Sequence, residues 1–180
     1  IELYHPKEIY DKIIVIDPSA DENALKIAGY LKELLDTSEI KAYYSRIEER
    51  DLTPAQRLSL SVGSEADFYI GIRMGNSENT QTYGTVVRYG GEYFQPEMDS
   101  ARLADLLERQ VTTAINGRAE GIFEDQEDFM LTQVPSMAVI LEPGYTTNPQ
   151  ERKYLKQPEY RRKIAEGIYE TILQAYEKME

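Results

Sequence analysis

The stretch KIIVIDPSADENALKIA, residues 12–28, decides the fold of this chain. Its first part is a short apolar run rich in β-branched residues, which predicts a buried strand over 12–17. Apolar residues then recur at helical spacing over 22–35 and form one apolar face. A buried strand that leads directly into an amphipathic helix is typical of an open α/β sheet, where ligands bind beyond the carboxyl ends of the strands. We therefore look for a functional site just after Asp17.

The same alternation of strands and helices continues along the chain. Thr53 and Pro54 mark the start of a helix, because Thr is a preferred N-cap and Pro suits the first helical position. The acidic segment 117–136 is irregular, with a short strand expected near 128–132. Other predicted strands lie at 40–46, 67–74, 85–89 and 137–144, and other predicted helices at 53–66, at 97–116 and in two segments that close the chain.

This pattern predicts one three-layer α/β domain over 1–180, with an N-terminal tail at 1–11. Its sheet is expected to be twisted and mostly parallel, with about six strands and with helices on both faces.

Composition excludes several classes of function. The 180 residues carry a formal net charge of −12, which argues against nucleic acid and anionic membrane surfaces as direct partners, since these are bound through Lys and Arg. The chain has no cysteine, which excludes disulfides, thiolate metal sites and cysteine nucleophiles. Its single histidine, His5, lies in the tail, whereas a histidine triad or a two-histidine zinc site needs an imidazole near the centre of the fold. The basic stretch 152–163 is flanked by acids, and we interpret it as a solvated helix face.

Four segments give the chain a specific likeness. It resembles the zinc-dependent N-acetylmuramoyl-L-alanine amidases of bacterial cell walls over roughly residues 12–176, most specifically in its C-terminal part. The segments are IVIDP (14–18), ALKIAGYLKELL (24–35), RDLTPAQRLSLSVGSEADFYIGIR (50–73) and PSMAVILEPGYTTNPQERKYLKQPEYRRKIAEGIYETIL (135–173).

The resemblance implies an activity and a metal site. It implies cleavage of the amide that joins the lactyl group of N-acetylmuramic acid to L-alanine. One zinc, held by two histidines and a glutamate, polarises the carbonyl and activates a water, and a second glutamate moves the proton. Glu142, in VILEPGY, matches that second glutamate, the general base of the family.

The metal ligands of the family do not carry over to this sequence. Ala20 stands where the first histidine belongs, and the glycine-rich loop that should follow it is absent. Arg73, in GIRMGN, stands at the second histidine, and a guanidinium has no lone pair for zinc. The resemblance and these departures together predict a degenerate member with vestigial metal positions and no bound zinc.

The remaining acids allow other interpretations. Glu22 fits a capping box, Ser19-x-x-Glu22, better than a metal ligand. Asp17, Glu22 and Glu142 offer oxygens to Mg²⁺ or Ca²⁺, although a guanidinium beside them disfavours a cation. A carboxylate at the end of a buried strand needs a partner to stay charged, and we expect an ion pair between Glu142 and Arg73. The alternative leaves Arg73 in solvent and Glu142 as the cap of a neighbouring backbone.

Three functions remain open at this point. The first is an amidase-like domain that has lost zinc and hydrolysis and binds peptidoglycan fragments or docks a wall-associated protein. Aromatic residues near the fourth strand suit stacking on sugars, a partner surface or packing against the adjacent helix: Tyr83, Tyr89, Tyr93 and Phe94. The second is an active amidase with a non-standard metal site that recruits His5. The third is a glycosidase-like pairing of Glu142 with Asp17.

The cellular location follows from the resemblance alone. It implies an extracellular, cell-wall or membrane-associated position in a bacterium, without direct membrane contact by this domain. The chain begins with Ile1 rather than Met, and we expect a trimmed or mature form.

Overall fold

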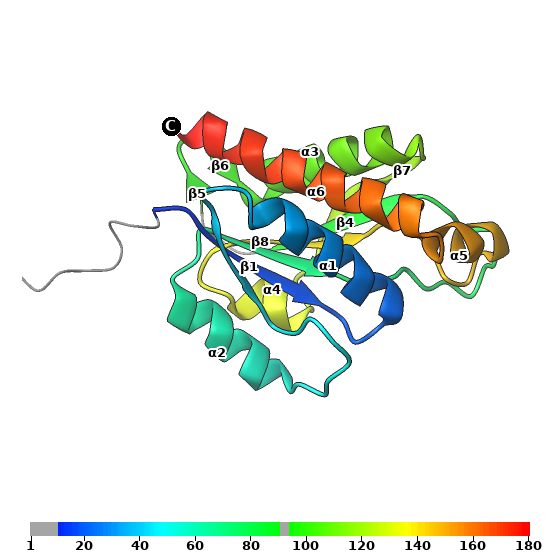
Figure 1. Cartoon of the computed structure of the whole chain (residues 1–180), viewed down its shortest axis with the longest axis horizontal. Coiled ribbons are helices and arrows are strands. Elements are labelled where there is room, and N and C mark those ends of the chain that lie inside the picture. Colours follow the sequence, from blue (N-terminus) through cyan, green and yellow to red (C-terminus); the bar gives the residue numbers. More distant parts are fainter. Residues whose placement is uncertain (1–10, 91–93) are drawn as a thin grey trace, which may run out of the picture.

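A six-stranded sheet organises the residues that the computed structural model describes, 11–90 and 94–180 (Figure 1). The strand order is β2-β1-β3-β8-β4-β7, in which β2, β1, β3 and β8 are parallel, β4 is antiparallel to β8, and β7 is parallel to β4. The strands are β1 (Ile13–Pro18), β2 (Lys41–Tyr44), β3 (Phe68–Ile72), β4 (Thr85–Gly90), β7 (Ala119–Glu124) and β8 (Met137–Glu142). A separate two-stranded sheet pairs β5 (Phe94–Gln95) with β6 (Met98–Asp99).

Helices cover both faces of the large sheet, which confirms the predicted three-layer α/β architecture. One face carries α1 (Glu22–Leu35), α3 (Ser100–Ile115) and α6 (Pro158–Met179), and the other carries α2 (Pro54–Ser64) and α4 (Phe129–Gln133) (Figure 1). The short helix α5 (Pro149–Leu155) lies at one end of the molecule, next to the start of α6 (Figure 1).

Side chains alternate in direction along the central strands, and this divides the hydrophobic core between the two faces of the sheet. Ile14 and Ile16 of β1 pack in the cluster under α1, α3 and α6, whereas Val15 packs in the smaller cluster under α2 and α4. Phe68 and Tyr69 of β3 divide in the same way. Successive side chains of a strand point to opposite faces, so one continuous apolar run supplies both clusters.

Local capping fixes where two of the helices begin. The predicted N-cap Thr53 is confirmed, and Pro54 is the first residue of α2; Thr53 and Gln56 also exchange side-chain and backbone hydrogen bonds, which makes this start a capping box. The capping box predicted at Ser19 and Glu22 is wrong. Asp21 is the N-cap of α1 instead, since its carboxylate accepts from the backbone N–H groups of Asn23 and Ala24.

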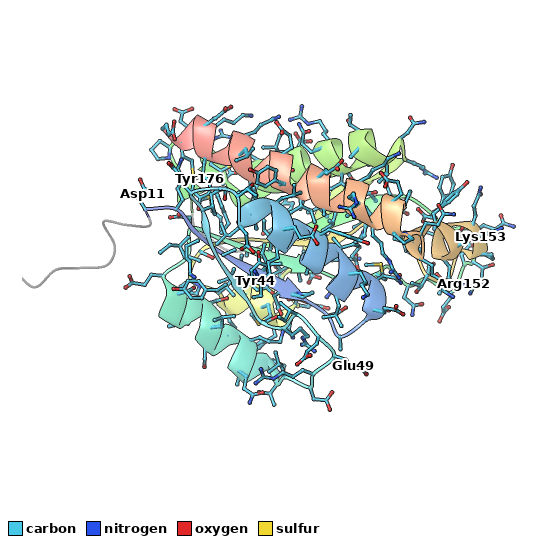
Figure 2. All side chains as sticks on the ribbon, viewed as in Figure 1. Asp11, Tyr44, Glu49, Arg152, Lys153 and Tyr176 are labelled. Atoms are coloured by element: carbon cyan, nitrogen blue, oxygen red, sulfur yellow. The ribbon has the colours of Figure 1, made fainter. Side chains whose placement is uncertain are left out.

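Two further expectations need correction. The segment near 128–132 is not a strand: Asp128 caps the helix α4, and the strand of this region is β7. Nor is 152–163 wholly a solvated face. Figure 2 shows Arg152 and Lys153 at the outer end of α5, but Arg161 is buried and donates to the backbone oxygen of Leu155 and to Asn23 Oδ1. In the described part of the chain, 11–90 and 94–180, no helix has the length and apolar character needed to cross a bilayer.

Candidate functional site

Strand register brings the candidate residues to one edge of the sheet. Pro18 of β1 pairs with Ile72 of β3, and Ile72 pairs with Leu141 of β8. The residues that follow or end these strands therefore lie at the same carboxyl edge, where ligands bind in parallel α/β sheets. Two charged clusters occupy this edge, one around Asp17 and one around Glu142.

The Asp17 cluster surrounds a buried carboxylate. Only 1% of the Asp17 side chain is exposed, and its oxygens accept from Arg57 Nε at 2.9 Å and Nη2 at 2.8 Å. Ser45 Oγ donates at 2.6 Å and the Tyr69 hydroxyl donates to Oδ2. Every hydrogen-bonding position of this carboxylate is filled by a guanidinium or a hydroxyl, so the buried charge is fully compensated.

Burial and charge shift the pKa values of the two partners of Asp17. Burial raises the pKa of Tyr69 well above its ordinary value, and the negative charge of Asp17 raises it further. Burial lowers the pKa of Arg57, but the hydrogen bonds and charge of Asp17 outweigh it and raise the value. Both shifts keep the donors protonated, so the cluster holds its hydrogen bonds throughout the physiological range.

The Glu142 cluster joins two arginines to three acids. Arg73 Nε donates to Glu142 Oε2 at 3.1 Å, and Arg88 Nε donates to Oε1 at 2.9 Å. Arg73 Nη1 also donates to Asp128 at 3.1 Å, and Arg88 Nη1 lies 3.8 Å from Asp125. The expected ion pair between Arg73 and Glu142 is confirmed, and the alternative in which Arg73 turns into solvent is wrong.

This second cluster is more open than the first. The Arg73 side chain is 36% exposed, whereas that of Glu142 is 11% exposed. Burial lowers the pKa of Arg73, and the charges and hydrogen bonds of Glu142 and Asp128 raise it more. Burial raises the pKa of Asp125, but backbone N–H groups of Glu127 and Asp128 and the charges of Arg88 and Arg73 bring it below its ordinary value.

A cavity of about 220 Å³ opens between the two clusters, and we call it the arginine cavity. Its charged lining consists of Arg46, Arg57, Arg73 and Asp17. The rest of its lining is uncharged: Ser19, Ala20, Tyr69, Gly71, Ile72 and Ile140. Arg46 follows β2 and donates Nη1 to the backbone oxygen of Arg50 at 2.6 Å.

A larger groove of about 1070 Å³ lies beside α5, and we call it the tyrosine groove. Its lining includes Tyr83, Tyr154 and Tyr160, and the rings of Tyr154 and Tyr160 stack at 5.6 Å. Tyr83 and Tyr154 are 46% and 39% exposed, and the Arg118 guanidinium lies 4.8 Å from the Tyr83 ring. Amide side chains also line the groove: Gln81, Asn116, Asn148, Gln150 and Gln157.

Known proteins share both the sequence pattern and this architecture. The N-acetylmuramoyl-L-alanine amidase family matches residues 19–174. This chain belongs to that family. A germination-specific N-acetylmuramoyl-L-alanine amidase of Bacillus subtilis is 31% identical over 135 residues, which cover 74% of the chain and 54% of that relative. The chain thus spans about half the length of this curated relative.

Solved amidase structures carry the same fold. An N-acetylmuramoyl-L-alanine amidase from Clostridium difficile 630 superposes with a TM-score of 0.84 at 21% identity, covering 94% of this chain and 98% of that one. The CwlD amidase of Clostridioides difficile, solved in complex with the GerS lipoprotein, gives 0.79 at 19% identity, covering 94% of this chain and all of that one. The predicted amidase fold is confirmed.

The residues predicted at the metal position of the family do not fit zinc. Ala20 brings no donor atom to the arginine cavity, and Arg73 brings a guanidinium, which has no lone pair. The oxygens of Asp17 and Glu142 are already engaged by arginines. Within 11–90 and 94–180, no three or more His, Cys, Asp or Glu side chains are grouped so as to hold a metal ion. His5 lies outside the described residues.

The other predicted site residues are dispersed. Glu22 is exposed in the first turn of α1 and lines neither the arginine cavity nor the tyrosine groove, so it is not brought together with Asp17 and Glu142 to hold a hard cation. Tyr83 lines the tyrosine groove, and Tyr89 packs against the main core. Tyr93 lies outside the described residues, as does the side chain of Phe94.

Sequence reasoning missed the partners that complete both clusters. A buried Asp17 requires a cation, but the sequence does not say which one, and Arg57 comes from α2, forty residues away. Arg88 and Asp128 come from β4 and α4, whose places depend on strand order. The sequence indicated that these buried acids need cationic partners, but it did not indicate which residues supply them.

Proposed function

We propose that this domain is an amidase-family member that binds peptidoglycan in the cell wall without zinc and without hydrolysing the amide. The observation that carries the proposal is the set of hydrogen bonds that Glu142 accepts. A general base takes a proton from water on a carboxylate oxygen, but each oxygen of Glu142 is held by a cationic donor, Oε2 by Arg73 and Oε1 by Arg88. A guanidinium where the family has a zinc ligand leaves Glu142 with a structural partner in place of a reacting one.

The tyrosine groove supports a glycan ligand for this binding function. Its rings offer flat apolar faces, and its amides offer donors and acceptors for hydroxyl and N-acetyl groups. Rigid aromatic anchors among polar side chains are typical of ligand sites in which a few polar groups fix orientation. A groove of this size takes several sugar units rather than a single functional group.

Metal analysis and a binding assay on the same sample test this proposal. The chain is incubated with excess zinc, desalted, and assayed for bound metal and for release of stem peptides from purified peptidoglycan. We expect far less than one zinc per chain, no peptide release, and cosedimentation of the chain with peptidoglycan. Stoichiometric zinc with peptide release would establish the active amidase instead.

Variants of the tyrosine groove locate the binding. Tyr154→Ala removes an exposed ring from the groove, and Tyr43→Ala removes a comparably exposed ring from β2 as a matched control. We expect the first variant to weaken cosedimentation by about fivefold, since stacking on one ring contributes on the order of 1 kcal/mol, and the second to leave it unchanged. Equal binding by both variants would remove the tyrosine groove from the proposal.

Docking of a wall-associated protein is a second candidate. The observation that favours it is the CwlD structure, in which a similar fold is in complex with a lipoprotein. Exposed tyrosines and an arginine also suit a protein interface. A chain that fails to cosediment with peptidoglycan but retains a specific protein from a wall extract would favour this candidate.

A further inference from the structure

We propose that the arginine cavity binds the carboxylate that amide cleavage leaves on the lactyl group of muramic acid. The domain would then recognise glycan from which an active amidase has already removed the peptide. This inference rests on the proposed function, because it names the chemical group that a non-hydrolytic domain would bind at the vestigial metal position.

The charges that line the cavity favour an anion. Three guanidinium groups face one carboxylate, and the oxygens of that carboxylate, Asp17, are already occupied. Glu142 and Asp128 offset the charge of Arg73 from outside the cavity lining. Arg57 is paired with Asp17, so the excess positive charge comes from Arg46, which donates to a backbone carbonyl rather than to a carboxylate.

Arg46 supplies an independent sign of a missing ligand. The residue is 9% exposed, and within the part of the chain that the structure describes its buried Nε has no hydrogen-bond partner. An unsatisfied buried donor is costly, more so when it is charged, and native proteins rarely leave one without a partner. A carboxylate in the cavity that Arg46 lines would supply the acceptor.

The size of the cavity suits one small group. Its 220 Å³ is about seven times the ~30 Å³ that a water molecule occupies in the liquid. A carboxylate on a short stem fits this space, and a disaccharide does not. Guanidinium groups match carboxylates particularly well, because two parallel N–H donors meet two oxygens.

The chemistry of amide hydrolysis makes the cleaved group distinctive. The C–N bond breaks, the oxygen of water joins the carbonyl carbon, and the amine of alanine takes up both protons of the water and leaves as an ammonium group. The lactyl group thereby changes from a neutral amide to an anionic carboxylate, which the intact strand does not carry at that position. An arginine-lined cavity would distinguish the two states by charge, and the reaction that must supply its ligand is amide hydrolysis by an active amidase.

Titration of the native chain with four small probes tests this without any variant. N-acetylmuramic acid carries the lactyl carboxylate, its lactyl amide is neutral, N-acetylglucosamine lacks the group, and acetate is an anion without a sugar. We expect N-acetylmuramic acid to bind at least about tenfold more tightly than the other three, the factor that a charge-assisted hydrogen bond provides. Equal binding of the acid and its amide, binding of acetate as tight as that of the acid, or no binding of the acid would each overturn the proposal.

Variants then place the carboxylate in the cavity. Arg46→Gln removes one cation from the lining, Arg46→Lys keeps the charge without the planar fork, and Arg109→Gln removes an exposed cation from α3 as the matched control. After thermal melting has verified folding, we expect Arg46→Gln to lose the preference for the acid, Arg46→Lys to keep part of it, and Arg109→Gln to keep all of it. Unchanged preference in Arg46→Gln would overturn the site. Cosedimentation of the native chain with peptidoglycan, measured alongside, would show whether the proposed function stands when this inference fails.

Discussion

Asp17 and Glu142 end two parallel strands at the same edge of the sheet, but the protein compensates their charges in different ways. Asp17 is sealed, with one arginine and two hydroxyls around it. Glu142 is shared between two arginines that themselves contact further acids, and Arg73 is partly exposed. The comparison indicates that burial makes the first cluster the larger contributor to stability, whereas the second leaves part of Arg73 exposed at the carboxyl edge of the sheet.

The largest expected effect on stability comes from a change in the Asp17 cluster. Arg57→Met leaves the carboxylate of Asp17 buried without its cation, and we expect a loss of about 3 kcal/mol in the free energy of unfolding, the low end for a broken buried pair because Ser45 and Tyr69 still donate. Urea denaturation measures it. The double variant Asp17→Asn, Arg57→Met is expected to lose less than the single variant. A loss below about 1 kcal/mol in Arg57→Met would show that the hydroxyls alone compensate the charge.

The corresponding substitution in the Glu142 cluster should lower the free energy of unfolding by less. A fully buried pair between Arg73 and Glu142 would predict a loss of about 3–5 kcal/mol for Arg73→Ala. Because Arg73 is partly exposed and Arg88 still holds Glu142, we expect about 1–2 kcal/mol. A double-mutant cycle with Arg88→Ala gives the coupling between the two arginines. A cost for Arg73→Ala as large as that of Arg57→Met would abolish the distinction between the clusters.

The sequence predicted the fold better than it predicted these clusters. The strand at Ile13–Pro18 and the helix at Glu22–Leu35 follow from their apolar spacing, and the layers follow from the alternation of strands and helices, whereas the order of the strands in the sheet was not predicted. The strand β7 was missed because it lies at the edge of the sheet, where one neighbour suffices and polar residues such as Glu120 and Glu124 are tolerated. The helix α4 was missed because five residues are too few to show a helical period.

Part of the site was within reach of sequence reasoning. Glu142 at the end of a buried strand required a cation, and Arg73 at the end of the neighbouring strand was the available one. Arg88 was not predictable, because it reaches Glu142 only through the antiparallel pairing of β4 with β8, in which Arg88 stands opposite Ile140. Arg46 was missed for a similar reason, since only the folded chain brings the loop after β2 to the cavity.

Lowering the pH should weaken the Glu142 cluster by protonating Asp125. Its pKa is lowered in the folded state, so its contribution to stability is present above the unfolded value near 3.9 and is lost as pH falls through the folded one. The free energy of unfolding of the native chain should fall below about pH 4. We expect this loss to be smaller in Asp125→Asn, by on the order of 0.5 kcal/mol after allowance for solvent screening. Chemical denaturation at a series of pH values measures the slope. An unchanged slope would exclude Asp125 from the acid response.

The smallest expected effect supplies the baseline for both clusters. Lys32 and Asp36 form an exposed i,i+4 pair on α1, with 2.6 Å between Nζ and Oδ2, a shorter contact than either arginine makes with Glu142. Solvent screening and side-chain entropy nonetheless limit such a pair, so we expect Lys32→Ala to cost about 0.3 kcal/mol, measured by the same urea denaturation. The order Arg57, Arg73, Lys32 then follows burial rather than distance. A cost for Lys32→Ala equal to that of Arg73→Ala would mean that the Glu142 cluster contributes no more to stability than an exposed ion pair on the protein surface.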